Sequence, residues 1–144
     1  MRVVVDTNVF VAGLLGKGGA SRKVLEACLR GQLAPLMGTA LYLEYEELLG
    51  RDEVWEECRL SATDREAVFD ALMSVCEWTH VYYRWRPNLR DERDNHVLEL
   101  AIAGGAVAIV TKNVRDFVGA ELTFPDLRVM KPEPLIEEIE SWPP

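Results

Sequence analysis

The amino-acid sequence predicts an α/β fold: a single-domain α/β/α sandwich with a central, mostly parallel sheet of about five strands. Short apolar runs alternate with longer segments of helical period along the 144 residues. Strands separated by helices form parallel sheets that are covered on both faces. A chain of this length is most simply one domain with a sizeable core. We expect the domain to span residues 1–141, followed by a short tail over residues 142–144.

The first predicted elements are a strand, a helix and a second strand. Three consecutive valines in residues 2–5 are typical of a strand buried on both faces. In residues 21–30, apolar side chains recur on one helix face, and Gly31 favours a stop there. Residues 33–37 form a short apolar run. Because Pro35 cannot donate a ladder hydrogen bond, we expect that strand to lie near an edge or to be irregular.

The middle of the chain is predicted to be mainly helical. Thr39 is the expected cap of one helix, and a short helix follows over residues 53–58. Ser61 with Asp64 three residues later resembles a capping box, so a helix is expected to run from there to about residue 77. A third strand is predicted over residues 79–83. The apolar positions of the helix after Thr39 are Leu41, Leu43, Tyr45, Leu48 and Leu49.

The last third of the chain returns to alternating helices and strands. A polar loop precedes a helix over residues 95–103, which two glycines end. Residues 106–111 form a second apolar run typical of a buried strand. The remaining predicted elements are a helical turn near Asp116, a small strand over residues 127–130 and a final helix that begins at Pro132.

Composition limits the possible functions. The formal net charge is -8, which argues against broad nonspecific binding of DNA by a basic surface. No segment approaches the roughly 18 apolar residues of a membrane span, and the start does not resemble a signal peptide. The three cysteines, Cys28, Cys58 and Cys76, are an odd number without metal-ligand spacing, so we expect buried free thiols and a cytoplasmic protein.

Four acidic residues fall where a shared site is expected: Asp6, Glu44, Asp94 and Asp116. Asp6 ends the first strand, and ligands of open α/β sheets bind just outside the carboxyl ends of strands. Asp116 follows the strand over residues 106–111, which also ends in polar residues. Glu44 lies on or beside an apolar helix stripe, where a carboxylate is costly to bury without a partner. Asp94 opens a helix and shares a face with apolar residues.

Carboxylates brought together in this way repel one another. Two unit charges about 4 Å apart cost roughly 4 kcal/mol at an effective dielectric constant near 20. Such clusters take up protons or a cation, and oxygen ligands without Cys or His favour Mg²⁺ or Mn²⁺ over zinc. A site of this kind is typical of phosphate-ester hydrolysis.

Each acid also has a simpler interpretation. Asp6 can cap the turn that follows the strand, and Asp94 can cap its own helix. Glu44 can be solvated, and Asp116 can be an ordinary loop acid. Asp91, in the polar loop, can replace or assist Asp94. The joint pattern favours a shared site, because four independent coincidences would otherwise fall at strand and helix ends.

Four segments of the chain resemble the PIN domain family. They are VVVDTNVFVA at residues 3–12, LEY at 43–45, RDERDN at 90–95 and VTKNVRDF at 110–117. Their order and spacing match across nearly the whole chain. The resemblance is strongest to the small stand-alone prokaryotic PIN proteins that act as toxins of toxin–antitoxin pairs. It implies an active site of three or four acids that binds Mg²⁺ or Mn²⁺ and cleaves RNA.

The resemblance assigns roles residue by residue. The first acid of the family falls on Asp6, the helical Glu on Glu44, the third acid on Asp94 and the less constant fourth on Asp116. Arg93 replaces an acid found in many relatives, which leaves the role of Asp91 open. Supporting polar residues are implied at four further positions, where they would orient the carboxylates or hold water: Thr7, Asn8, Thr111 and Asn113.

The implied activity is hydrolysis of phosphodiester bonds in single-stranded RNA by a Mg²⁺/Mn²⁺-dependent endoribonuclease. The implied partners are a small antitoxin and a second copy of the chain. Basic residues around the acids are candidates for phosphate binding, although pairing with nearby Asp and Glu is an equal alternative. They are Arg90, Arg93, Lys112 and Arg115, with a weaker second patch at Lys17, Arg22 and Lys23.

Two other functional classes fit less well. A PIN-like module that binds RNA or a protein without cleavage is the main alternative, and the intact set of acids argues against it. A phosphotransfer receiver or a dehalogenase-type phosphatase also places an Asp at a strand tip. Such a phosphatase requires a second Asp two residues later, where this chain has Asn8.

Overall fold

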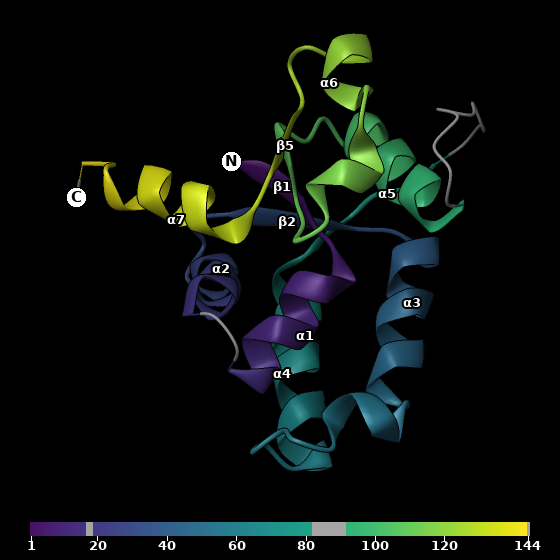
Figure 1. The fold of residues 1–144 in the computed structure, drawn as a ribbon, viewed down its shortest axis with the longest axis vertical. Coiled ribbons are helices and arrows are strands. Elements are labelled where there is room, and N and C mark those ends of the chain that lie inside the picture. The colour runs from purple at the N-terminus through teal and green to yellow at the C-terminus, as the bar shows by residue number, and fades with distance from the viewer. Residues whose placement is uncertain (17–18, 82–91, 144) are drawn as a thin grey trace.

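Five parallel strands form one sheet in the order β3-β2-β1-β4-β5 (Figure 1). The computed structural model describes residues 1–16, 19–81 and 92–143. The sheet is entirely parallel within these residues, and the predicted α/β class and strand number are confirmed. The strands are β1 (Arg2–Val5), β2 (Ala34–Met37), β3 (Glu77–Trp78), β4 (Ala108–Val110) and β5 (Arg128–Met130).

Helices cover both faces of the sheet. In the view of Figure 1, α5 and α6 lie on one side of the strands, and α1, α2 and α4 lie on the other. Helix α5 packs against β1, β2 and β4, whereas α2 packs against α1, α4 and α7. The α-helices are α1 (Thr7–Leu15), α2 (Gly19–Leu29), α3 (Thr39–Leu49), α4 (Ala62–Val75), α5 (Glu92–Ala103), α6 (Ala120–Thr123) and α7 (Pro132–Glu140). Two 3₁₀ helices are η1 (Asp52–Trp55) and η2 (Val114–Phe117).

Strand β1 lies at the centre of the sheet and of the core. Its residue Val3 pairs with Ala108 of β4, and Val3, Val4 and Ile109 are completely buried. The chain leaves β1 toward β2 on one side and later returns to β4 on the other side. In a parallel sheet this reversal opens a crevice at the carboxyl ends of the two central strands. The fold therefore places the residues after β1 and β4 side by side.

Two helices were missed by the sequence analysis, α1 and α6. The segment from Thr7 to Leu15 is almost uniformly apolar, and its residues Val9, Phe10 and Leu14 are buried. A helix with so little polar surface has no visible period in the sequence. Helix α1 is therefore recognisable mainly from the capping residue before it, Asp6.

Strand β2 lies near an edge of the sheet, as expected from Pro35, because only the two-residue β3 pairs outside it. The N–H of Ala34 bonds to Met1 on the β1 side, so the nitrogen of Pro35 faces the β3 side, where pairing begins only at Leu36. Proline is thus tolerated inside the sheet because no ladder donor is needed there.

The next helix and strand differ from the prediction. Gly38, not Thr39, is the N-cap of α3, and it provides no side-chain cap. Leu43, expected on the apolar face of that helix, is 58% exposed. The third strand is two residues long and lies earlier than residues 79–83, and residues 82 and 83 fall outside the described part of the chain.

Several local predictions are confirmed. The Ser61 hydroxyl accepts a hydrogen bond from the Asp64 N–H at 3.1 Å, Pro132 opens α7, and Gly31 adopts a positive φ of 81°. All three cysteines are free thiols, but only Cys28 is fully buried. Burial raises the pKa of the Cys28 and Cys76 thiols to about 12, so both stay protonated at neutral pH.

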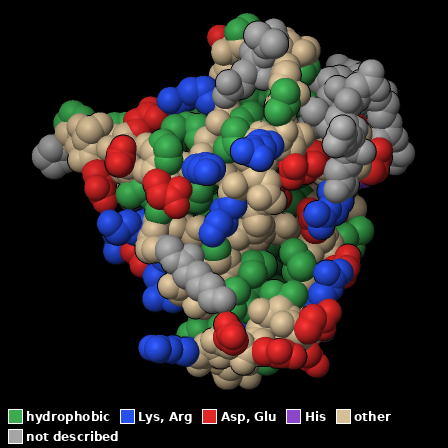
Figure 2. All heavy atoms as spheres, viewed as in Figure 1, with side chains coloured by type: hydrophobic (Ala, Val, Ile, Leu, Met, Phe, Trp, Pro, Cys, Tyr) green, Lys and Arg blue, Asp and Glu red, His purple; other side chains and the backbone are tan. Residues whose placement is uncertain are grey.

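The surface shows mixed charge. On the face seen in Figure 2, Lys and Arg side chains are interspersed with Asp and Glu side chains. None of the described helices is long and apolar enough to cross a membrane.

The turn after α5 gives a test of the packing. A Cβ atom on Gly104 would lie 2.4 Å from Cδ1 of the buried Leu36 and 3.2 Å from Oγ1 of Thr79. We expect Gly104→Ala to lower the free energy of unfolding by about 1–3 kcal/mol, because the core must shift to admit the methyl group. Urea denaturation would measure this loss.

Gly50→Ala is the matched control. Gly50 has helical dihedral angles, and an added Cβ would meet its nearest atoms at an ordinary 3.7 Å. The change at Gly50 should stay within about 0.5 kcal/mol. Equal effects of the two substitutions would contradict the packing assigned to the turn after α5.

Candidate functional site

Asp6 occupies the junction between β1 and α1. Its backbone N–H bonds to the carbonyl of Val110, so the sheet pairing continues to this residue. Its side chain caps α1 by accepting a hydrogen bond from the Thr7 N–H at 2.8 Å. Only 8% of Asp6 is exposed. Asp6 is therefore a helix cap, as one interpretation of the sequence predicted. Its carboxylate also faces other acids.

A polar network from the end of β4 holds the second oxygen of Asp6. The Thr111 hydroxyl donates to Asp6 Oδ2 at 2.8 Å and accepts a hydrogen bond from the Asn113 N–H at 3.1 Å. The Asn8 amide donates to Thr111 Oγ1 at 3.2 Å, and its oxygen accepts from the Lys112 N–H at 3.0 Å. This network ties the start of α1 to the end of β4 and fixes the orientation of the carboxylate.

Glu44 and Asp94 approach the same place from two helices. Glu44 lies in the middle of α3, and 14% of its side chain is exposed. The helix α5 begins at Glu92, three residues before the predicted start, so Asp94 lies in its first turn. Asp94 is also buried. An acid in a first helical turn is favoured by the helix dipole. Neither residue has the solvated position of a purely surface acid.

Asp116 is the most exposed of the four predicted acids. It lies in η2, the turn that follows β4, and its backbone N–H bonds to the carbonyl of Asn113. Its charge reaches Asp6 and raises the pKa of that carboxyl group. The turn therefore brings the carboxylate back over the carboxyl end of the sheet.

Burial dominates the electrostatics of Asp6. Desolvation raises the pKa of its carboxyl group above the ordinary value, with a smaller contribution from Asp116. Hydrogen bonds from Thr111 and Thr7 and the charge of Arg93 act in the opposite direction. The net direction is upward, so the ionised carboxylate of Asp6 is held in the fold at a cost.

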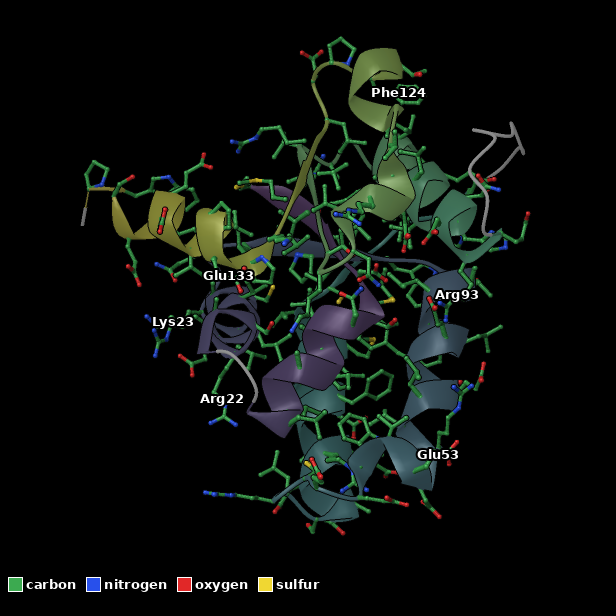
Figure 3. All side chains as sticks on the ribbon, viewed as in Figure 1. Arg22, Lys23, Glu53, Arg93, Phe124 and Glu133 are labelled. Carbon is green, nitrogen blue, oxygen red and sulfur yellow. The ribbon has the colours of Figure 1, made fainter. Side chains whose placement is uncertain are left out.

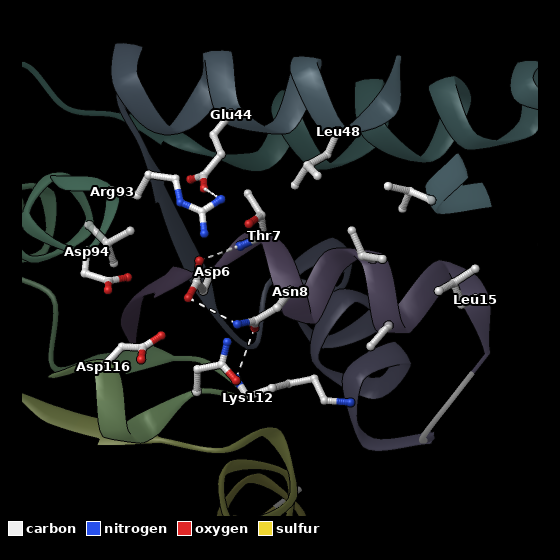
Figure 4. Close-up of a pocket in the computed structure, with 15 residues that line it drawn as sticks. Asp6, Thr7, Asn8, Leu15, Glu44, Leu48, Arg93, Asp94, Lys112 and Asp116 are labelled. Carbon is white, nitrogen blue, oxygen red and sulfur yellow. Dashed lines mark hydrogen bonds and ion pairs between the residues drawn. The ribbon is translucent and has the colours of Figure 1, made fainter. Parts of the chain in front are cut away.

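All four predicted acids line one cavity of about 400 Å³ (Figure 4). Thr7, Asn8 and Asn113 line its polar end as well. The other end, between α1 and α3, is apolar and was not anticipated from the sequence. Its side chains are Val11, Ala12, Leu15, Leu48 and Val54.

The donor chemistry of the cavity fits a hard divalent cation. Its described lining offers carboxylate and amide oxygens but neither His nor Cys. Across residues 1–16, 19–81 and 92–143, however, no three acidic, His or Cys side chains form a preassembled set of metal ligands. The acids share a cavity, and binding of a cation between them requires their side chains to move closer together.

The predicted phosphate-binding residues are divided between two depressions. Arg93 and Lys112 line the acidic cavity, and Arg93 Nη1 lies 3.1 Å from Glu44 Oε1. Arg115 lines a neighbouring depression of about 540 Å³ together with Lys112 and Lys131. Arg90, like Asp91, lies outside the described residues.

The weaker basic patch lies elsewhere. Arg22 and Lys23 project from α2, apart from Arg93 (Figure 3). Lys23 pairs with Glu140 at 3.2 Å, and Arg22 donates to the carbonyl of Gly13. Both contacts lie away from the acidic cavity. Lys17 is outside the described residues.

Lys131 was missed by the sequence analysis, although a signal for it was present. It immediately follows β5, a predicted strand, so the strand-end rule that singled out Asp6 applies to it equally. The apolar end of the cavity had no such signal, because it is formed by α1, which has no visible helical period, and by the side of α3.

Comparison with known proteins identifies the family and the fold. A family model described as PIN domain matches residues 2–115. The crystal structure of VapBC2 from Rickettsia felis, bound to a DNA fragment from its promoter, shares the fold at 15% sequence identity with a TM-score of 0.60. That match covers 91% of this chain and 98% of the other. No curated protein matches the sequence significantly.

The family match covers β1, α3 and α5, and so includes Asp6, Glu44 and Asp94, and it ends at residue 115, one residue before Asp116. The chain belongs to the PIN domain family, whose members are generally nucleases.

Proposed function

We propose that this protein is a divalent-metal-dependent endoribonuclease that hydrolyses phosphodiester bonds of single-stranded RNA. One observation carries the proposal: Asp6, Glu44, Asp94 and Asp116 come from four separate elements and line a single cavity. Membership of the PIN family supports nuclease activity, and the oxygen donors support Mg²⁺ or Mn²⁺.

Asp6, Glu44 and Asp94 are the proposed metal ligands, with Asp116 as a fourth. When bound, the cation polarises the phosphoryl group and makes water a stronger nucleophile. Two donors orient Asp6, since Thr7 and Thr111 each donate a hydrogen bond to it. This support fixes the carboxylate before the substrate arrives, and so lowers the cost of ordering the site.

The proposed RNA path crosses the basic residues at the edge of the cavity. Lys112 lines both the acidic cavity and the neighbouring depression that contains Arg115 and Lys131. Phosphates on either side of the scissile bond would bind these cations and be held in register with the acids. Asn113, which lines both depressions, is placed to hold water between them.

We also propose that a small antitoxin is the cellular partner and that the chain forms a homodimer in the cytoplasm. The structurally similar Rickettsia felis protein belongs to the complex named VapBC2. In this chain the apolar end of the cavity, at Leu15, Leu48 and Val54, offers a surface that a protein partner can cover next to the acids. Sequestering the acids in this way would block substrate access.

A non-cleaving binding module is the second candidate. It is favoured by the ion pair between Arg93 and Glu44, which places a protein cation where a metal ligand is proposed. The two candidates share the fold and differ in whether RNA is cut, so an assay of metal-dependent RNA cleavage separates them.

The substitution Asp6→Asn keeps the size of the side chain but removes its charge. We expect Mn²⁺-dependent cleavage of single-stranded RNA to fall by about 100-fold or more, because a carboxylate held by two hydrogen bonds at the centre of the site is lost. Asp126→Asn, at an exposed position away from the cavity, is the control and should cleave normally. Wild-type protein that binds RNA but does not cut it with either metal would favour the binding module.

Metal binding should also raise the thermal stability of the folded protein. We expect Mg²⁺ or Mn²⁺ to raise the melting temperature of the wild type, because a cation that binds only the folded state stabilises it by about 2.7 kcal/mol at 100 times its dissociation constant. Asp94→Asn should show a much smaller rise, and chelation should reverse both. Equal rises in wild type and Asp94→Asn would place the cation elsewhere.

The raised pKa of Asp6 predicts a pH dependence of the metal-free protein. The folded state favours the protonated carboxyl group, so stability is lost as the pH rises through the folded-state pKa. Asp6→Asn removes that penalty. Asp6→Asn should therefore gain stability relative to wild type as the pH rises. In chelator, its free energy of unfolding minus that of the wild type should be larger at pH 7 than near pH 4, as measured by urea denaturation. A difference with the opposite pH trend would contradict the burial cost assigned to Asp6.

A further inference from the structure

Arg93 occupies a position among the carboxylates of the cavity. It lies in the first turn of α5, directly before Asp94, and its guanidinium lies 3.1 Å from Glu44 of α3. Figure 4 shows this guanidinium between the carboxylates of Glu44 and Asp6. Its charge favours the ionised form of Asp6, so it acts on two of the four acids. In the metal-free protein, Arg93 is thus a counter-cation of the cluster.

The two halves of this ion pair differ in exposure. The Glu44 side chain is 14% exposed, whereas the Arg93 side chain is 64% exposed. Glu44 is held within the helical layer, but the stem of Arg93 reaches in from solvent. Arg93 can therefore leave the cavity by rotating its own side chain, without movement of α3 or α5.

A guanidinium and a divalent cation on the same carboxylate repel each other. A metal ion that takes Glu44 as a ligand therefore competes with Arg93 for that carboxylate. The displaced guanidinium remains at the mouth of the cavity, because its backbone is anchored beside Asp94. A planar guanidinium binds phosphate oxygens in a bidentate manner, and a phosphate of the RNA backbone is the anion expected there.

We propose that Arg93 couples metal binding to RNA binding: it pairs with Glu44 in the empty site and exchanges that carboxylate for an RNA phosphate when the metal binds. This inference rests on the proposed function and adds the order in which charges are exchanged. Coupling between two ligands is reciprocal. An RNA strand therefore raises the affinity for metal, and metal raises the affinity for RNA, through the same side chain.

The test is calorimetric titration of Mn²⁺ into wild type and Arg93→Met, with and without a phosphorothioate-linked oligouridylate of about ten nucleotides. Without the oligonucleotide, Arg93→Met should bind Mn²⁺ about three- to tenfold more tightly than wild type, because the Arg93 guanidinium no longer competes for Glu44. The oligonucleotide should tighten Mn²⁺ binding by wild type but not by Arg93→Met.

Lys112→Met is the matched control. It removes one positive charge from the lining of the same cavity, and the described contacts of Lys112 include no ion pair with Glu44. The control should change Mn²⁺ affinity less than Arg93→Met. Because Lys112 lies on the proposed RNA path, Lys112→Met should bind the oligonucleotide more weakly, but at saturating oligonucleotide it should keep the enhancement of Mn²⁺ binding. Melting curves in chelator establish that each variant is folded, and Arg93→Gln replaces Arg93→Met if the latter is not.

The possible failures are distinguishable. If Arg93→Met binds Mn²⁺ no more tightly than Lys112→Met, or if the oligonucleotide enhances Mn²⁺ binding equally in wild type and Arg93→Met, the coupling role of Arg93 is wrong and the proposed nuclease function stands. If neither wild type nor Arg93→Met binds Mn²⁺, the metal-dependent function is itself wrong, and the inference falls with it.

Discussion

The buried carboxylate of Asp6 is the constraint around which this site is built. It ends the central strand, caps the first helix through the Thr7 N–H and accepts a hydrogen bond from Thr111 at the end of the neighbouring strand. Those bonds offset part of the cost of burying its charge. The same carboxylate therefore serves local folding and, as we propose, the binding of a cation, and its hydrogen bonds orient it for both.

The parallel sheet explains why the other acids gather near Asp6. Strands β1 and β4 are neighbours, although about a hundred residues separate them in the chain, and their carboxyl ends open the same crevice. Helices α3 and α5, which contact each other, then contribute Glu44 and Asp94 to that crevice. The apolar end of the cavity, between α1 and α3, extends away from the acids. A ligand in this cavity therefore contacts charged side chains at one end and apolar side chains at the other.

The proposed RNA substrate is negatively charged, and so is this protein, so the two repel each other overall. The net charge is -8, and the cavity itself is lined by four acids. Under the proposed function, Arg93, Lys112 and Lys131 would contact the phosphate backbone, and a divalent ion would neutralise the acids between them. Affinity for nucleic acid would then depend on whether the site holds metal rather than on the overall charge of the surface.

The fold class, the central strand and the four acids that share the cavity could be predicted from local sequence, because these depend on apolar runs and on residues at strand ends. Sequence analysis missed α1, whose uniform apolarity hides the helical period, whereas the place of β2 near an edge agrees with the expectation from Pro35. The ion pair between Arg93 and Glu44 and the apolar end of the cavity became visible only in the folded structure. Those features arise where separate helices meet across the sheet, and contacts between distant elements leave no periodic signal in either segment alone.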